Sequence, residues 1–230
     1  MPRLEVGGEQ EPGGLRAGAG GITSPRMIEL PKATVVRLPR YLRLLEDLES
    51  KETVSSEELA EAAGANAANV RRDLSHLDFH GVRGVGYSVA DLKYRIRQEL
   101  GIADRRQVAI IGAGNLGRAL AAYGGLSRRG FDVAAVYDTD TRKVGSKAGR
   151  VEVRNLQDMD SDCRGGCFDM AILAVPAVAA QQVTDRLVDL GINSILNFAP
   201  VRVNVPINVT VRQVDLSMEL QVLSYYGNRP

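Results

Sequence analysis

The feature that most constrains this fold is an apolar run, Gln107–Ile111, that leads directly into Gly112-x-Gly114-x-x-Gly117. The pattern predicts a strand, a tight turn and the start of a helix. Gly112 permits the turn, Gly114 lacks the Cβ that would block an approaching phosphate, and Gly117 allows the helix to pack on the strand. Free amides at the start of that helix would then face an anion.

A second apolar run favours a dinucleotide as that anion. Residues Asp132–Tyr137 follow the helix and end at Asp138, where dinucleotide-binding folds place the acid that accepts hydrogen bonds from ribose hydroxyls. A carboxylate there repels a 2′-phosphate, so NADH/NAD+ is the expected cofactor, although Arg142 and Lys143 lie close behind and soften the repulsion. A glycine-rich turn that binds nothing is the alternative.

The chain continues as an α/β domain. Strands are expected at Phe168–Val175 and Asn193–Phe198, a helix at Ala177–Leu190, and short β segments between Val203 and Val214. Ligands of open parallel sheets lie beyond the carboxyl ends of the strands. The residues expected to bind the cofactor are therefore Gly112, Ala113, Gly114, Asn115, Leu116, Gly117, Asp138, Val175, Pro176, Asn197 and Phe198.

The N-terminal half carries the pattern of a helix-turn-helix. Ser55 and Glu58 have the spacing of a capping box, Ala60 is small where two helices approach, Gly64 suits the turn, and Val70 locks the second helix. A helical hairpin that touches no DNA has the same spacing. The second helix offers side chains suited to base edges and phosphates, namely Asn66, Asn69, Arg71, Arg72 and Ser75.

A short two-stranded hairpin is expected at His80–Val89, where glycines alternate with Val, Arg and Tyr. A hairpin after a helix-turn-helix makes a winged helix, with Arg83 near the wing tip, where a cation reaches the minor groove. This combination favours double-stranded DNA as a partner. Helices at Asp91–Leu100 and from Lys32 onward complete the unit. Pro39 should kink or divide the helix that begins at Lys32. The predicted apolar face of that helix holds Val35, Val36, Leu38, Leu42, Leu45 and Leu48.

The predicted fold class is α/β, with a winged helix-turn-helix before a Rossmann-like domain. Residues 1–30 are Gly-rich and lack apolar periodicity, so a disordered tail is expected there. The winged helix is assigned to residues 31–102 and the dinucleotide-binding domain to 103–214. Residues 215–230 form a last helix, capped by Asp215, with Leu216, Leu220 and Leu223 on one face. An apolar face with no following element to cover it suggests a homodimer contact.

Membrane and metal partners are not expected. No apolar run approaches the length of a membrane span and the N-terminus lacks a signal-peptide core, so a cytoplasmic location is expected. Cys163 and Cys167 have only His76 and His80 as potential co-ligands, far away in sequence. Free thiols in a surface loop are favoured over a redox pair.

An enzyme is disfavoured because a catalytic set is missing. Hydride transfer to a carbonyl needs a positioned acid or base. After Gly117 the chain has no histidine, and its lysines, Lys143 and Lys147, both lie in the loop region behind Asp138. Tyr123, Tyr137, Tyr225 and Tyr226 remain as alternative acids for weak catalysis. A DNA-binding module joined to a dinucleotide-binding domain that lacks a catalytic set indicates a sensor. The alternatives are an NAD-dependent oxidoreductase with an appended DNA-binding or scaffolding head, and a nucleotide-binding structural protein without a DNA partner.

The chain resembles the redox-sensing transcriptional repressor Rex family from about Ile28 to Tyr226. The resemblance is carried by residues 30–39, 68–75, 83–87, 112–117, 175–181, 195–200 and 214–221. It implies a homodimeric repressor that binds operators when NAD+ dominates, releases them when NADH rises, and swaps its C-terminal helix between protomers. By matched position, it also implies that Tyr123 lies near the nicotinamide and that Arg43 and Asp215 pair in a state-dependent way.

One departure from the family pattern follows the second helix of the helix-turn-helix. Where the family usually has Tyr-Phe-Gly after Ser75, this chain has His76-Leu77-Asp78. The loss of a glycine and the gain of a carboxylate beside the wing are expected to weaken DNA affinity or to shift operator preference.

Overall fold

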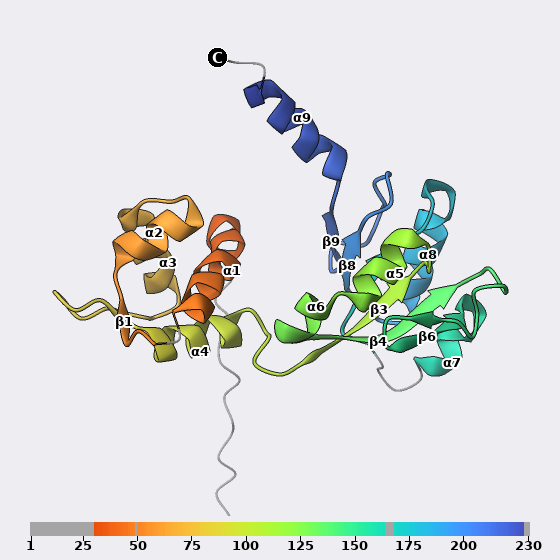
Figure 1. Ribbon diagram of the computed structural model, residues 1–230, viewed down its shortest axis with the longest axis horizontal. Coiled ribbons are helices and arrows are strands. Elements are labelled where there is room, and N and C mark those ends of the chain that lie inside the picture. Colours follow the sequence, from red (N-terminus) through yellow and green to blue (C-terminus); the bar gives the residue numbers. More distant parts are fainter. Residues whose placement is uncertain (1–29, 49, 164–167, 228–230) are drawn as a thin grey trace, which may run out of the picture.

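The computed structural model describes residues 30–48, 50–163 and 168–227. The tail predicted at residues 1–30 lies outside this part of the chain, apart from Leu30. The described elements form a helical unit and an α/β unit, joined by the short segment between α4 and β3 (Figure 1).

The helical unit is a winged helix. Its hydrophobic core is formed by all four helices, and β1 pairs with β2 in a two-stranded antiparallel sheet. The elements are α1 (Lys32–Asp47), β1 (Thr53–Val54), α2 (Ser56–Ala63), α3 (Ala67–His76), β2 (Tyr87–Ser88) and α4 (Val89–Glu99).

Helix α1 differs from the prediction in two ways. It runs unbroken through Pro39, so the predicted division of the helix is wrong. Val35 and Val36, assigned to the apolar face, are exposed, whereas the polar residues Thr34 and Tyr41 are buried. The buried face is turned toward these two residues because their hydroxyls both donate hydrogen bonds to Asp73 of α3.

The helix-turn-helix follows the sequence closely. Ser55 and Glu58 form the predicted capping box at the start of α2. Gly64 adopts a left-handed conformation, with φ of 62°, and ends the helix there. Ala60 and Val70 are both buried in the core of this unit, as expected of a small residue at a close helix approach and of an aliphatic residue that packs the second helix against the first.

The wing is shorter than the predicted hairpin. Its own pairing is a single bridge between Val82 and Gly86, with Arg83 in the connecting turn. The following residues pair with β1 instead, Tyr87 lying opposite Val54. Gly86 has φ of 106°, and a Cβ at this position would lie 2.5 Å from the Val54 carbonyl oxygen, so only glycine permits this approach.

The α/β unit is built on one seven-stranded sheet of order β5-β6-β4-β3-β7-β8-β9, in which only β5 is antiparallel to its neighbour. The strands are β3 (Arg106–Ile111), β4 (Phe131–Asp138), β5 (Lys147–Ala148), β6 (Val151–Asn155), β7 (Met170–Leu173), β8 (Ser194–Asn197) and β9 (Thr210–Gln213). The chain crosses from β6 past β4 and β3 to β7, so the strand order reverses between β3 and β7.

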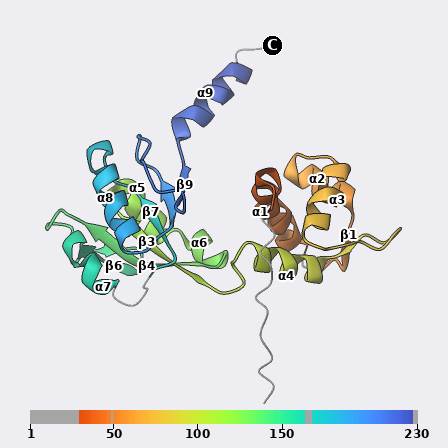
Figure 2. The same ribbon diagram turned by 180° about the vertical axis from the view of Figure 1, so that it is seen from behind.

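Helices cover both faces of the sheet. Helix α5 (Asn115–Ala122) lies on one face together with α6 (Gly124–Arg128), and α8 (Ala177–Asp189) lies on the other, as the front and rear views show (Figures 1 and 2). The short helices η1 (Leu156–Asp158) and α7 (Met159–Asp162) precede β7. The sequence did not indicate α6, β5 or α7, which are too short to show periodicity, nor β6, in whose five residues apolar side chains alternate with exposed polar ones instead of forming an apolar run.

Two smaller expectations in this half are wrong. Of the β segments expected between Val203 and Val214, only β9 forms. Cys163 is not a free thiol in a surface loop; it ends α7, is buried in the core on that face, and is disulfide-bonded. Cys167 lies outside the described residues.

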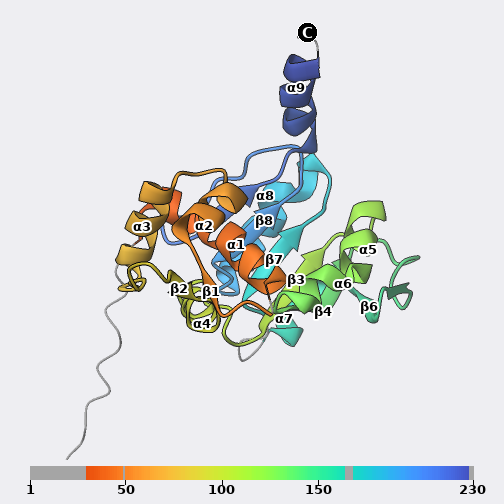
Figure 3. The ribbon, with the colours of Figure 1, turned by 60° about the vertical axis from the view of Figure 1, so that its left-hand side comes forward.

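The two units touch at the amino ends of β3 and β4. Phe131, the first residue of β4, packs against both the core of the winged helix and the core beneath α5 and α6. The Arg106 Nε donates to the Gly101 carbonyl oxygen at 2.5 Å, which bridges the connection between α4 and β3. Figure 3 views this junction from the side of the winged helix.

The last helix, α9 (Leu216–Gly227), projects away from the α/β unit and buries none of its residues (Figure 1). The Asp215 carboxylate accepts hydrogen bonds from the backbone and hydroxyl of Ser217, as expected of a residue that caps this helix. Leu216, Leu220 and Leu223 are all exposed. The uncovered apolar face inferred from the sequence is therefore present in the single chain.

Within residues 30–48, 50–163 and 168–227, no helix is both long and apolar enough to cross a membrane. The same part of the chain brings no three His, Cys, Asp or Glu side chains together as a metal-binding group.

Candidate functional site

A crevice of about 520 Å³ lies beyond the carboxyl ends of β3, β4 and β7. This is the place at which open α/β sheets bind ligands. Seven residues predicted to bind the cofactor line it, namely Gly112, Gly114, Leu116, Asp138, Val175, Pro176 and Phe198.

The glycine-rich turn forms the floor of the crevice. Gly112 has φ of 105°, and a Cβ there would collide with the Ala174 carbonyl oxygen. A Cβ at Gly117 would collide with the Gly112 carbonyl, so this glycine lets α5 pack against the turn. A Cβ at Gly114 would meet nothing within 4 Å. Space therefore remains beside Gly114, at the start of α5, where an anion would be held by free amides.

Asp138 ends β4 at the opposite wall and is almost fully buried. Its Oδ2 accepts hydrogen bonds from the Ala113 amide at 2.7 Å and the Lys143 Nζ at 2.9 Å, and its Oδ1 accepts from the Asp140 amide at 2.8 Å. Burial alone would raise the pKa of this carboxyl, but the two amides and the ammonium group lower it below its ordinary value. Asp138 therefore presents a carboxylate to the crevice.

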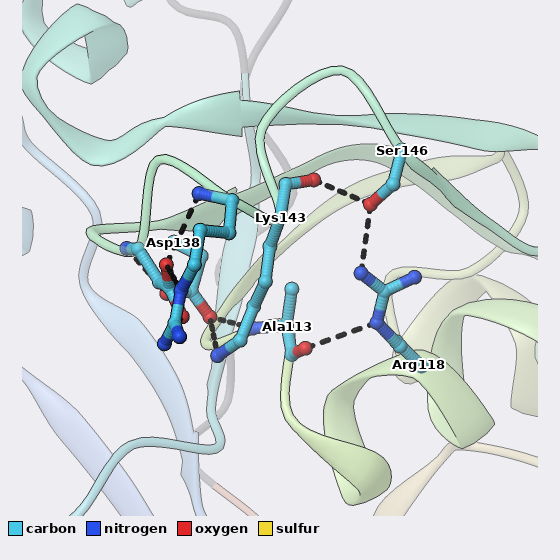
Figure 4. A network of polar contacts seen from close by, with 7 residues as sticks. Ala113, Arg118, Asp138, Lys143 and Ser146 are labelled. Carbon is cyan, nitrogen blue, oxygen red and sulfur yellow. Dashed lines mark hydrogen bonds and ion pairs between the residues drawn. The ribbon is translucent and has the colours of Figure 1, made fainter.

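The loop behind Asp138 is tied to α5 (Figure 4). Arg118 donates from Nε to the Ala113 carbonyl at 3.1 Å and from Nη2 to Ser146 at 2.7 Å. The Ser146 hydroxyl in turn donates to the Lys143 carbonyl. The glycine turn, the acid and the basic loop are thus linked by one network of hydrogen bonds.

Sequence reasoning did not place several of the crevice residues. Lys143 was considered only as a screening charge, yet its ammonium group pairs directly with Asp138. Its position five residues behind the acid, in the same loop, was the available signal. The other lining residues that were not predicted as a site are Ile111, Tyr137, Thr139, Asp140, Leu156, Ala179 and Val183.

Five predicted cofactor residues do not line the crevice. Ala113 contributes its backbone amide to Asp138, and Asn115 and Gly117 belong to the first turns of α5. Asn197 is fully buried; its amide nitrogen donates to the Val201 carbonyl and to Gln213, so its side chain holds the following loop in place. Tyr123 lies at the far end of α5 and lines a separate cavity of about 450 Å³.

The recognition helix α3 presents most of its predicted DNA-binding residues to solvent. Arg71, Arg72 and Ser75 are exposed, and Asn69 is half-buried. Arg71 is oriented by the start of α2, since its Nη1 donates to the Ser56 hydroxyl at 2.8 Å and lies 3.4 Å from the Glu57 carboxylate. Asn66 has a different role, because its side chain caps α3 by accepting from the Asn69 amide.

The wing and the preceding turn complete this face. Arg83 is exposed at the wing tip, between the bridged residues Val82 and Gly86. Asp78, where the family pattern has glycine, adopts a left-handed conformation with φ of 51°. The backbone therefore keeps the conformation that glycine favours, and an aspartate is held in it at some cost in free energy.

Arg43 and Asp215, the predicted switch pair, are both exposed. Arg43 lies in the middle of α1 and Asp215 directly before α9. The contacts between described residues include no ion pair joining them.

Two family models match the two halves of the chain. One, described as "Putative DNA-binding protein N-terminus", matches residues 29–75, and the other, described as "CoA binding domain", matches residues 104–201. The first match ends within α3 and the second begins in the segment between α4 and β3, so residues 76–103, which hold the wing, β2 and α4, lie between the two matches.

Similar proteins cover nearly the whole chain. The redox-sensing transcriptional repressor Rex of Streptomyces avermitilis is 50% identical over 202 residues, which are 87% of this chain and 80% of that protein. The repressor of the same name from Carboxydothermus hydrogenoformans is 43% identical over 199 residues, or 86% of this chain and 96% of that protein.

Solved structures agree with these relatives. The structure of RSP in complex with β-NAD+ and operator DNA gives a TM-score of 0.80 at 37% identity, covering 86% of this chain and 93% of that one. RSP in complex with β-NADH gives 0.77 at 37% identity, covering 87% and 95%. The predicted fold class, a winged helix-turn-helix followed by a Rossmann-like domain, is confirmed.

Proposed function

Because the chain belongs to the redox-sensing transcriptional repressor Rex family, we propose that it binds operator DNA as a homodimer when NADH is low and releases the DNA when NADH binds. Relatives carry the name of redox-sensing repressor, and RSP has been solved with β-NAD+ and operator DNA and with β-NADH. A repressor of this kind acts on DNA, so we assign it to the cytoplasm.

The observation that carries the proposal is the position of Phe131. It begins β4, the strand that ends at Asp138 in the crevice, and it packs against the core of the winged helix. A shift of β4 in response to a ligand would therefore move Phe131 and change its packing against the DNA-binding unit. Allostery requires such an element, whose arrangement both sites can bias.

The crevice fits a dinucleotide. The open space at Gly114 leaves room for the pyrophosphate at the start of α5, and Asp138 has the charge to accept hydrogen bonds from the adenosine ribose. Val175, Pro176 and Phe198 supply the apolar wall for the nicotinamide. The Asp138 carboxylate favours NADH over NADPH, and Lys143 reduces that preference.

The winged helix fits duplex DNA. Asn69, Arg71, Arg72 and Ser75 of the recognition helix would contact bases or phosphates in the major groove, and Arg83 the minor groove. Asn66 would act through its cap, which fixes the start of α3. We assign two such heads to one palindromic operator.

The second protomer completes the sensor. The uncovered apolar face of α9 is the proposed dimer contact, exchanged between protomers. Tyr123 is separated from its own glycine turn by the eight residues of α5, about 12 Å of helix, so we place its contact with the nicotinamide held by the partner. Arg43 and Asp215 would likewise pair across the dimer in one of the two states.

We propose no enzymatic activity. The titratable side chains among the crevice residues are Tyr137, Asp138, Asp140 and Lys143. Lys143 is paired with Asp138, and the Tyr137 hydroxyl donates to Asp162, so neither is free to serve a substrate carbonyl as acid or base. NADH oxidation tested with a panel of small carbonyl compounds should be negligible; turnover would favour the oxidoreductase alternative.

The deciding experiment is a fluorescence-anisotropy titration of the full chain on a palindromic duplex selected from random DNA. It is repeated with NADH, NAD+ and NADPH at fixed salt, because phosphate contacts make affinity salt-dependent. Release by NADH alone at low concentration supports the proposal. Binding that no nucleotide changes would show that the two units are uncoupled, and absence of salt-dependent binding would favour the structural alternative.

A further inference from the structure

Tyr123 occupies the junction between two helices on one face of the sheet. It ends α5 and immediately precedes α6, and its amide donates to the Leu120 carbonyl while its own carbonyl accepts from Leu126. The backbone of this residue is therefore fixed by both helices. Its side chain is 54% exposed, so the ring is held mainly by what lies beneath it.

Gly125 lies beneath the ring. A Cβ built on Gly125 would fall 2.5 Å from both the Cε1 and the hydroxyl oxygen of Tyr123, closer than real Cβ contacts allow. The phenol end of Tyr123 thus rests directly on the backbone of α6. Gly125 is buried and does not have a left-handed conformation, so a turn geometry does not require glycine here.

The collision would be relieved cheaply. The atoms that a Cβ meets belong to the far end of one flexible side chain, and rotation about the Tyr123 side-chain torsions removes them. An alanine at position 125 would therefore change where the ring lies without requiring α6 to move. The substitution Gly125→Ala therefore tests the position of the ring without disturbing the fold of α6.

We infer that Gly125 is a positioning residue for Tyr123, holding the phenol against α6 and thereby setting the NADH concentration at which DNA is released. The inference rests on the proposed contact of Tyr123 with the nicotinamide. The ring lies against Gly125 in the single chain, and we take contact with a ligand on the partner to require that it leave this position. The fraction of molecules with the ring outward scales the apparent affinity for NADH.

The test compares Gly125→Ala with Gly124→Ala in the full chain. The control removes the neighbouring glycine of the same helix, where a Cβ would meet only an Arg128 nitrogen at an ordinary 3.8 Å. Gly125→Ala should lower the NADH concentration for half-release of DNA by about fivefold, because the inward position is removed. Gly124→Ala should leave it unchanged.

Two further measurements assign the cause. Fluorine NMR of chain labelled with 3-fluorotyrosine, with the Tyr123 signal identified by its loss in Tyr123→Phe, reports ring position without NADH or DNA. The Tyr123 signal should shift in Gly125→Ala and not in Gly124→Ala. In a Tyr123→Ala background, Gly125→Ala should no longer change the half-release concentration, because its effect passes through the ring.

The outcomes separate this inference from the proposed function. An unshifted Tyr123 signal in Gly125→Ala overturns the inference, whether or not NADH releases DNA. A shifted signal with an unchanged release concentration also overturns it, as does an effect that persists without Tyr123. A wild-type chain that NADH never releases rejects the proposed function, and the NMR comparison then still decides whether Gly125 positions the ring.

Discussion

The Asp73 carboxylate of the recognition helix accepts hydrogen bonds from both Nε and Nη2 of Arg37, at 2.6 and 2.7 Å, in a bidentate ion pair that joins α3 to α1. Asp73 is only 1% exposed, and its remaining acceptor positions are filled by the hydroxyls of Thr34 and Tyr41. A buried carboxylate with every partner present stabilises one arrangement of two helices, and the loss of one partner leaves the others unsatisfied.

Asp73→Asn weakens hydrogen bonds to a charged group and should therefore lower the free energy of unfolding by about 2 kcal/mol at neutral pH. Urea unfolding followed by circular dichroism measures this. Arg37→Lys keeps the charge but not the bidentate geometry, and it should lower the free energy of unfolding by less than Asp73→Asn does. An Asp73→Asn variant as stable as the wild type would show that the network contributes nothing.

The same carboxyl predicts a pH dependence. Burial raises the pKa of Asp73, but the hydrogen bonds from Arg37, Tyr41 and Thr34 together bring it below its ordinary value of 3.8. A lowered pKa in the folded state gives stability that is present above the ordinary value and lost as pH falls through the folded value. The stability difference between wild type and Asp73→Asn should therefore be constant above about pH 5 and narrow below about pH 4.

Cofactor preference depends on the pair formed by Asp138 and Lys143. Asp138→Ala leaves the ammonium group without its partner, which attracts a 2′-phosphate, so the ratio of NADH to NADPH affinity should fall at least about tenfold. Lys143→Ala leaves the carboxylate uncompensated and should raise the ratio about fivefold. Titration of NADH and NADPH fluorescence measures both.

Arg142→Ala is the control for these variants. Arg142 is 88% exposed and pairs with Asp140 at the rim, so its removal should change the ratio by less than about twofold. Equal losses of NADH and NADPH affinity in Asp138→Ala would show that Asp138 does not contact the ribose.

The ion pair between Arg71 and Glu57 predicts that substitution of either residue changes the affinity for DNA. Glu57 places a carboxylate beside a guanidinium group that is proposed to meet DNA, and it would repel the phosphates. Glu57→Gln should tighten duplex binding by about threefold at low salt, whereas Arg71→Ala should weaken it and reduce the salt slope by about one unit. Glu152→Gln removes the same charge from the α/β unit and should have no effect; an equal gain there would indicate net charge alone.

The sequence predicted those features that depend on local backbone chemistry. The capping box at Ser55 and Glu58, the left-handed Gly64 and the glycine turn before α5 each follow from residue types at fixed spacing. It failed where long-range contacts decide. The buried face of α1 is set by Asp73, nearly 40 residues away in sequence, and Asn197 is used by a neighbouring loop rather than by the crevice.

The candidate site divides in the same way. Asp138 could be placed from the length of the preceding strand and helix, but its ion pair with Lys143 depends on how the loop folds back. Tyr123 could be identified only by resemblance, because no local pattern marks it. Its distance from the crevice of its own chain becomes clear once α5 is seen to separate them.

Asp78 offers a test of the departure from the family pattern. Its φ of 51° favours glycine, so Asp78→Gly should relieve strain and stabilise the winged helix by about 0.5 kcal/mol, whereas Asp78→Ala should destabilise it by about 1 kcal/mol. Thermal unfolding measures both variants. Operator binding by Asp78→Gly then shows whether the carboxylate itself weakens DNA contact; a variant less stable than the wild type would contradict the strain argument.

Helix α9 predicts how the chain assembles. Leu220 lies on the exposed apolar face with Leu216 and Leu223, and burying one leucine against a partner contributes about 2 kcal/mol. Leu220→Asp should therefore convert the proposed dimer to monomer in light scattering, and affinity for the palindromic duplex should fall at least about a hundredfold because two linked heads become one. Gln221→Asp, the same charge on the adjacent residue of this helix, should leave both properties intact. A Leu220→Asp chain that remains dimeric would assign the dimer contact to another surface.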